Sequence, residues 1–329
     1  MAQNRARVQP VVAGGKGRSV SIERNPSILG MRTKSELVDY VDSLFAQEGS
    51  AQQLGVDAAK LRALIERVSR RYKQNPYHNF HHAADTVNTI GWMITRPVLR
   101  VKLPVYRRFL LMLTALIHDI EHPGHNNQWE VQTQSPLAKK YDNEAVLEKH
   151  SYKVTVEILA DPAYDLFLPF GKKKTQAWLR IIEQLVLATD FALHQQFMDE
   201  FRAYLANHSH DFSDPDFLGW IERALLKAAD IANTSKPFPE AMVWGRRVMM
   251  EFWSQGVLEK KHNFPVGPLN DPETVKLNAA QAGFIRFAAM ELFELLSEVE
   301  PGLEEMVENL RTNLELYEEK ARRGDGLFE

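Results

Sequence analysis

From Ser35 onward, apolar residues recur every three or four positions with polar residues between them, in segments that Pro, Gly, Asn and Asp separate. This is the spacing of amphipathic α-helices, and no stretch alternates as a β-strand does. The sequence therefore predicts one all-α domain without internal repeats. Its main helices are expected at residues 35–45, 58–72, 105–120, 143–160, 177–206, 216–232, 240–256 and 278–299.

The two ends of the chain depart from this pattern. Residues 1 to about 30 are rich in Gly, Ser, Arg and Pro and show no period, so we expect a flexible leader or linker over residues 1–34. The folded domain is then expected over residues 35–329. Its final stretch, YEEKARRGDGLFE, is expected to form a charged tail.

Composition narrows the classes of function. The 329 residues carry a net charge of −3 and a pI of about 6.4, so no basic excess indicates nucleic acid or an acidic membrane as the main partner. The longest apolar run, Phe109 to Ile117, is about half of what a bilayer crossing requires, and no secretory signal opens the chain. We expect a cytoplasmic location. Because the chain has no cysteine, only His, Asp and Glu remain as metal ligands.

Histidines are concentrated in two short stretches. In YHNFHHAAD (residues 77–85), His78 and His82 are four apart and would share one face if a helix begins here. Such a pair alone is more often a surface or packing accident than a site. The second stretch, HDIEHPGHNN (residues 118–127), directly follows the apolar run FLLMLTALI.

The second stretch carries more information than the first. His118 and Asp119 are adjacent, so they can bind one ion only where a helix ends, and Pro123 and Gly124 predict such an end. His122 follows Asp119 by three positions and can share its face. Histidine at a helix carboxyl end also has a plain explanation in the helix dipole, but that explanation does not account for the aspartate.

A third signal lies in LLKAADIANTSKP (residues 225–237), where Asp230 interrupts the apolar face of a helix. Burying an unpaired charge costs several kcal/mol, so Asp230 needs a partner. That partner is either an Arg or Lys, or a metal. Together with His82, His118 and Asp119 it makes a His/Asp set suited to zinc or another divalent ion.

These stretches resemble motifs of the HD-type metal-dependent phosphohydrolases, and within them the catalytic domain of the class I cyclic nucleotide phosphodiesterases. The resemblance covers about residues 35–315 and implies a compact multi-helix domain with a binuclear metal site in a deep pocket. The matching segments, in the order of the family, are YHNFHHAADTV, HDIEHPGHNNQ, YDNEAVLEKH, VLATDFALH and QAGFIRF.

The resemblance implies a role for each ligand. His82, His118, Asp119 and Asp230 would hold the tighter ion, usually Zn²⁺, and Asp119 would also bridge to a second ion, usually Mg²⁺ or Mn²⁺. A hydroxide shared by the two ions would attack the phosphorus.

It also implies the catalytic side chains. His78 would be the general acid that protonates O3′, while His122, Glu144 and Thr189 would hold the waters around the ions. Glu121 stands where the family usually has Asp. Because that residue is not a ligand in the family, we expect asparagine at Glu121 to matter little.

A purine pocket follows from the same resemblance. Gln281 and Phe284 are three apart on one helical face, so an amide can bond the purine edge while a ring stacks on its plane. Without the resemblance, Phe284 would be interpreted as a residue of the hydrophobic core and not of a binding pocket. The other positions that would line the pocket are Tyr77, Asn233, Val248, Phe252 and Leu269.

The expected reaction is hydrolysis of 3′,5′-cyclic nucleotides, with cGMP favoured and cAMP retained, because VLATDFALHQQFMDEF, HPGHNN and AAQAGFIRF look most like the high-affinity cGMP-specific branch. Another HD-type nucleotide phosphohydrolase and a non-catalytic cyclic nucleotide-binding module are the alternatives. A homodimer, and a regulatory module attached outside this sequence, are left open.

Overall fold

The computed structural model of the chain describes residues 22–24 and 28–324, and every regular element in these ranges is a helix, which confirms the all-α prediction. None of these helices combines the length and hydropathy that a bilayer crossing requires. The α-helices are α1 (Lys34–Glu48), α2 (Ser50–Leu54), α3 (Ala58–Arg71), α4 (Phe80–Ile94), α5 (Pro97–Lys102), α6 (Val105–Ile117), α7 (Asn127–Gln132), α8 (Pro136–Lys140), α9 (Val146–Leu159), α10 (Lys172–Leu187), α11 (His194–Asn207), α12 (Pro215–Asp230), α13 (Phe238–Lys261), α14 (Leu277–Phe284), α15 (Met290–Val299) and α16 (Glu304–Arg323). Between them lie the 3-10 turns η1 (Ile28–Gly30), η2 (Leu168–Phe170), η3 (Phe191–Leu193), η4 (Ala232–Ser235) and η6 (Pro301–Leu303), and a π-helical turn, η5 (Ile285–Ala289).

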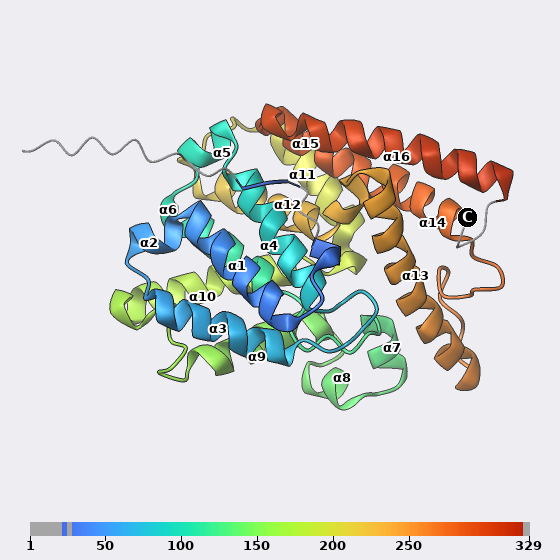
Figure 1. Ribbon diagram of the computed structural model, residues 1–329, viewed down its shortest axis with the longest axis horizontal. Helices are drawn as coiled ribbons and strands as arrows, with labels where there is room; N and C mark the ends of the chain where they lie inside the picture. Colours follow the sequence, from blue (N-terminus) through green and yellow to red (C-terminus); the bar gives the residue numbers. More distant parts are fainter. Residues whose placement is uncertain (1–21, 25–27, 325–329) are drawn as a thin grey trace, which may run out of the picture.

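Helices α4 and α6 pack against each other in the core of the domain (Figure 1). Every residue of α6 from Arg108 to Ile117 is buried, and in α4 only His81 is not. Helices α1 and α12 pack on α4, and α10 packs on α6. Burial of each Leu, Ile or Phe side chain contributes about 1.5–3 kcal/mol, so this core fixes the positions of the helix ends that carry the polar residues.

The helix expected over residues 177–206 is divided into α10 and α11. Between them, the side chain of Asp190 accepts a hydrogen bond from the backbone N–H of Ala192, two residues farther along the chain, at 3.0 Å. Aspartate often competes with helical hydrogen bonds in this way. The break leaves Thr189 in a loop rather than inside a helix.

Two of the longer helices lie outside the segments expected from the sequence. Helix α4 begins within the first histidine stretch and continues to Ile94, and α16 continues to Arg323. The stretch YEEKARRGDGLFE therefore begins as helix and not as a charged tail, since Tyr317 packs in the core with 1% of its surface exposed. Residues 325–329 of that stretch lie outside the described residues.

Part of the expected leader also packs on the domain. Ile22 and Ile28 are core residues, 3% and 0% exposed. Arg24 donates a hydrogen bond to the carbonyl of Ser235 at 2.6 Å, and Asn88 donates to the carbonyl of Arg24 at 2.9 Å. The described part of residues 22–34 therefore belongs to the packed domain, while residues 1–21 and 25–27 of the expected leader lie outside the described residues.

Candidate metal and catalytic site

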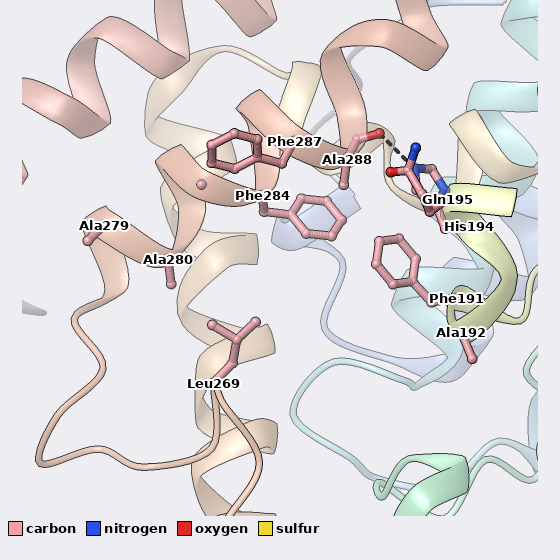
Figure 2. Close-up of a pocket in the computed structure, with 11 residues that line it drawn as sticks. Phe191, Ala192, His194, Gln195, Leu269, Ala279, Ala280, Phe284, Phe287 and Ala288 are labelled. Atoms are coloured by element: carbon pink, nitrogen blue, oxygen red, sulfur yellow. Dashed lines mark hydrogen bonds between the residues drawn. The ribbon is translucent and has the colours of Figure 1, made fainter. Parts of the chain in front are cut away.

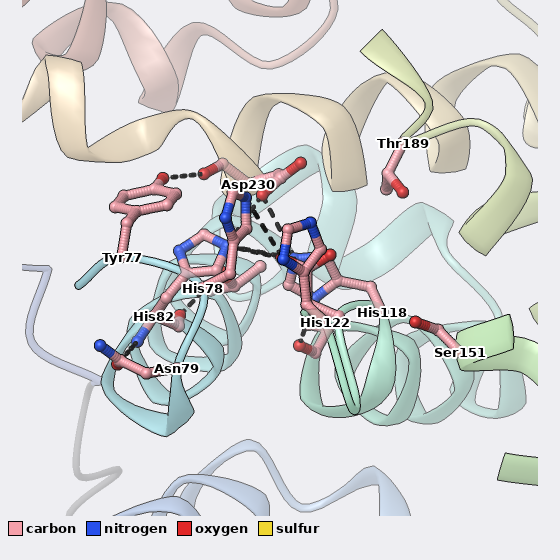
Figure 3. A network of polar contacts seen from close by, with 12 residues as sticks. Tyr77, His78, Asn79, His82, His118, His122, Ser151, Thr189 and Asp230 are labelled. Atoms are coloured by element: carbon pink, nitrogen blue, oxygen red, sulfur yellow. Dashed lines mark hydrogen bonds and ion pairs between the residues drawn. The ribbon is translucent and has the colours of Figure 1, made fainter. Parts of the chain in front are cut away.

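Four side chains from three helices converge at one point (Figure 3). His82 comes from the first turn of α4, His118 caps the carboxyl end of α6 with Asp119 beside it, and Asp230 is the last residue of α12. One donor atom from each lies within 4.8 Å of the others. The four ligands predicted from the sequence are thus brought together.

The distances and tautomers fit a bound cation. Nε2 of His82 and Nε2 of His118 lie 2.9 and 3.2 Å from Oδ1 of Asp230, and 3.2 Å from each other. Because Nδ1 of His118 bonds the carbonyl of Ala115 at 3.0 Å, the ring in its neutral, metal-binding form would carry the lone pair on Nε2, toward the cluster. Two imidazole nitrogens and two carboxylates form a donor set that suits a divalent ion such as zinc.

Charge holds the same cluster together. Burial alone would raise the pKa of Asp230, but the charge of His118 and the hydrogen bonds with His118 and His82 together outweigh burial and lower it. In turn, burial would lower the pKa of His118, and the charges of Asp119 and Asp230 raise it well above its usual value. The ion pairs of Asp230 in the described residues are with His82 and His118, so the Arg or Lys partner considered from the sequence is not found.

His78 reaches the cluster from outside the helix. Helix α4 begins at Phe80 with Asn79 as its amino-terminal cap, so His78 lies outside the helix. The shared helical face that a helix over both histidines would have given is therefore not formed. Their rings nevertheless lie 5.9 Å apart, and Nε2 of His78 lies 3.9 Å from Oδ2 of Asp119. The loop, and not a shared helical face, brings His78 to the site.

Glu251 of α13 holds His78 in place and was not identified from the sequence. Its carboxylate bonds Nδ1 of His78 and accepts the backbone N–H groups of Tyr77 and His78 at 2.9 and 3.1 Å. Burial alone would lower the pKa of His78, but the charges of Glu251 and Asp119 raise it to about 9. The signal that could have revealed Glu251 is the one used for Asp230: a carboxylate inside an apolar helical stretch, here MMEFW.

His122 stacks on His78, with ring centroids 3.9 Å apart and planes 24° apart. Burial and the charge of His78 lower the pKa of His122 to about 3, so the ring is neutral. Its Nδ1 accepts the N–H of Gly124 at 3.1 Å, which leaves Nε2–H as a donor. Asn75 donates to the carbonyls of His78 and His122 at 2.9 and 2.8 Å and so fixes their relative positions.

The structure does not bring Glu144 to this site. Its side chain is 78% exposed and pairs with Lys149 at 3.2 Å. Glu148, one turn farther along the same motif, is the half-buried carboxylate: it accepts a hydrogen bond from Asn127 at 2.9 Å, and desolvation followed by the charge of Asp190 raises its pKa to about 7. Because α9 begins only at Val146, Glu144 lies outside the helix whose face carries Glu148.

Thr189 lies beside Asp230. Both residues line a small cavity together with Phe191, His194 and Lys227. The hydroxyl of Thr189 donates to the carbonyl of Val186 at 2.7 Å, which leaves its lone pairs free to accept from a water. The cavity therefore gives Thr189 access to the carboxylate predicted to bind the metal.

A larger cavity of about 460 Å³ adjoins the small one, since Phe191 and His194 line both (Figure 2). Leu269 and Phe284, two of the residues expected in the purine pocket, line its wall. Phe284 stacks on Phe191 at 5.5 Å, and Phe191 stacks on His194 at 4.8 Å. The sequence did not identify Phe191, which is 48% exposed and forms the boundary between the two cavities.

Gln281, Val248 and Phe252 were also predicted to line the purine pocket, but they are not among the residues that line the larger cavity. Gln281 is 6% exposed and fits against Gly245, where a Cβ would lie 3.1 Å from the carboxamide carbon. Val248 and Phe252 do not line the larger cavity, and the ring of Phe252 packs partly against the core.

Tyr77 and Asn233 bond each other instead of lining the larger cavity. Nδ2 of Asn233 donates to the hydroxyl of Tyr77 at 2.6 Å, and that hydroxyl donates to the carbonyl of Asp230 at 3.3 Å. Both side chains therefore support the backbone at a predicted metal ligand.

Comparisons with known proteins agree on one family. The profile of the family described as 3′5′-cyclic nucleotide phosphodiesterase matches residues 77–310. The high affinity cGMP-specific 3′,5′-cyclic phosphodiesterase 9A of Homo sapiens is 30% identical over 299 residues, 90% of this chain and 50% of that protein. The 3′,5′-cyclic-AMP phosphodiesterase 4C of Mus musculus is 27% identical over 295 residues, 86% of this chain and 43% of that protein.

Solved structures show the same relationship. LmjPDEB1 in complex with IBMX has a TM-score of 0.83 and 30% identity, and 88% of each chain is covered. The phosphodiesterase domain of the RhoPDE fusion protein from the choanoflagellate Salpingoeca rosetta has a TM-score of 0.85 and 25% identity, covering 92% of this chain and 96% of that one. The present chain spans about half the length of the first curated relatives it matches.

Proposed function

Because the chain belongs to the 3′5′-cyclic nucleotide phosphodiesterase family, we propose that it is a metal-dependent catalytic domain that hydrolyses a 3′,5′-cyclic nucleotide to the 5′-nucleoside monophosphate. The observation that carries the proposal is the His82, His118, Asp119 and Asp230 cluster with His78 beside it. We propose that the predicted residues 35–329, together with the packed residues among 22–34, form the catalytic domain, and that its location is the cytoplasm.

The chain supplies ligands for a metal and a proton donor. We propose Zn²⁺ at the four-residue cluster and Mg²⁺ or Mn²⁺ next to Asp119, where bound ions would acidify a water and offset charge on the phosphate. His78 would give its Nε2 proton to O3′ as the ester bond breaks, because Glu251 keeps the ring protonated at neutral pH and holds it by Nδ1. His122, Glu148 and Thr189 would orient water through their donors and acceptors.

The larger cavity is the proposed purine site. Phe284 and Phe191 offer aromatic faces there, and Leu269 closes part of the wall. Gln281 is proposed to bond the purine edge after a local rearrangement that exposes its amide. An amide presents a donor or an acceptor by rotating, so Gln281 alone does not choose between guanine and adenine. We propose cGMP as the favoured substrate because the motif similarity to the cGMP-specific branch supports it.

Steady-state hydrolysis of cGMP and cAMP, side by side, tests the proposal. The protein is stripped with a chelator, then assayed before and after zinc and magnesium are restored. Metal-dependent release of 5′-GMP at a higher kcat/KM than 5′-AMP is expected. Binding without turnover of either nucleotide would instead support a non-catalytic binding module. Turnover of nucleoside triphosphates, with Gln281→Ala leaving cyclic nucleotide kinetics unchanged, would support another HD-type phosphohydrolase.

A further inference from the structure

The turn that carries Asp119 and His122 has an unusual backbone. The N–H of His122 donates to the carbonyl of Asp119 at 3.0 Å, which closes the turn, and Glu121 within it has φ +64°. This left-handed conformation suits glycine and strains a residue with a side chain. A glutamate at this position is therefore expected to make contacts that offset the backbone strain.

The side chain of Glu121 binds two helices. One carboxylate oxygen forms an ion pair with Nε of Arg71, the last residue of α3, and the other accepts a hydrogen bond from Nε2 of His150 in α9 at 2.9 Å. The hydroxyl of Tyr141 lies 3.3 Å from Nδ1 of His150. A donated Tyr141 proton would leave the Nε2 proton of His150 for Glu121.

Tyr72 and Ser151, the sequence neighbours of Arg71 and His150, hold the backbone of the same turn. Tyr72, next to Arg71, accepts the N–H of Asp119 at 3.3 Å and donates to the carbonyl of Leu116 at 3.0 Å. Ser151, next to His150, donates to the carbonyl of Ile120 at 3.3 Å. The end of α3 and the start of α9 thus contact the turn from two sides, and Glu121 supplies the side-chain link to both.

We propose that Glu121 is a positioning residue for the metal site: its carboxylate holds the strained turn between α3 and α9, so that Asp119 and His122 face the cluster. The inference rests on the proposed metal site. It reverses the expectation, drawn from the sequence, that asparagine at this position would matter little.

The test is the zinc affinity of the full chain after metal removal, measured by competition with a chromophoric chelator. Glu121→Gly removes the side-chain link and relieves the backbone strain at the same time, so the sign of the change in affinity shows which effect is larger. We expect zinc binding about 10–100-fold weaker, the usual effect of losing a residue that orients a metal ligand. If the relief of strain outweighed the loss of the link, the zinc affinity of this variant would instead stay unchanged or rise.

Three further variants complete the design. Glu121→Gln keeps the shape but not the charge and should lose part of the affinity, whereas Glu121→Asp keeps the charge and should recover most of it. Glu66→Gln is the matched control, because it removes a glutamate on α3 whose ion pairs, with Arg62 and Arg70, are on the surface. Its zinc affinity should equal that of the unmodified chain.

The outcomes separate the two proposals. Weak or absent zinc binding by the unmodified chain would overturn the proposed function and this inference with it. Tight binding by the unmodified chain, with equal affinity in Glu121→Gly and Glu121→Gln, would overturn this inference alone. If Glu121→Gly does not fold, Glu121→Gln decides the question. For these variants, saturating zinc and magnesium should restore kcat, while the KM for the cyclic nucleotide stays unchanged.

Discussion

Replacing Glu251 with glutamine removes the negative charge that faces the ring of His78. Burial works against protonation of this ring, and the charges of Glu251 and then Asp119 raise its pKa from 6.5 to about 9. That difference corresponds to about 3 kcal/mol in favour of the protonated form. Because Glu251 is the larger of the two charge effects, we expect the pKa of His78 to fall in the variant.

The sign of the effect on rate follows from the role of His78. A general acid acts while it is protonated, so its contribution is present below its pKa and is lost as the pH rises through it. At pH 8, a pKa of about 9 leaves about nine-tenths of the rings protonated, and a fall of about two units would leave about one-tenth. Glu251→Gln should therefore lower kcat about tenfold at pH 8 and much less near pH 6.

The assay is kcat for cGMP across pH, with zinc and magnesium saturating, for the unmodified chain, Glu251→Gln, His78→Ala and the double variant. The basic limb of the profile should move to lower pH in Glu251→Gln. Adding Glu251→Gln to His78→Ala should leave the profile where it is, because the group whose pKa changes is gone. A Glu251→Gln profile parallel to that of the unmodified chain at every pH would refute the reasoning, since Glu251 would then act only through its backbone hydrogen bonds.

Four more results are expected. Asp230→Ala should lose tight metal and activity together, measured by metal content and hydrolysis, because three ligands leave the site incomplete. His78→Ala should keep its metal while kcat falls by about two to four powers of ten; loss of zinc in this variant would contradict the role of His78. Glu148→Gln should lower kcat and Glu144→Gln should not, and equal effects would show that burial does not distinguish the two carboxylates. Arg24→Ala should lower the free energy of unfolding by about 1–3 kcal/mol in urea titration, because it removes a charged hydrogen bond to the carbonyl of Ser235, which then keeps the amide of Asn309 as its donor.

The two glutamates of YDNEAVLEKH show where sequence reasoning stops. They are four positions apart, so a continuous helix would place both on one face. In the structure Ala145 has φ +40°, the helix starts after it, and Glu144 turns to solvent while Glu148 is half-buried near Asp190. The start of α9 depends on tertiary packing, and the motif alone did not resolve it.

The residues that support the site show the same limit. The contacts between His78 and Glu251 join positions 173 residues apart, and those between Glu121 and His150 join positions 29 apart. No periodicity connects such pairs, because their proximity arises only when separate helices pack. Phe191 likewise looks like one more apolar residue of a long helix until the turn at Asp190 places it between two cavities.

The sequence by itself determined the all-α class and pointed to the four side chains that we propose bind the metal. The helical period of about 3.6 residues is a local property, and charged or imidazole groups that interrupt it stand out for the cost of burying them. Only the tertiary structure decided which atoms face one another: the 3.2 Å between Nε2 of His82 and Nε2 of His118, the carboxylate behind His78, and the exposed position of Glu144. These depend on where each helix ends and how the helices cross, which is settled by packing of the whole core.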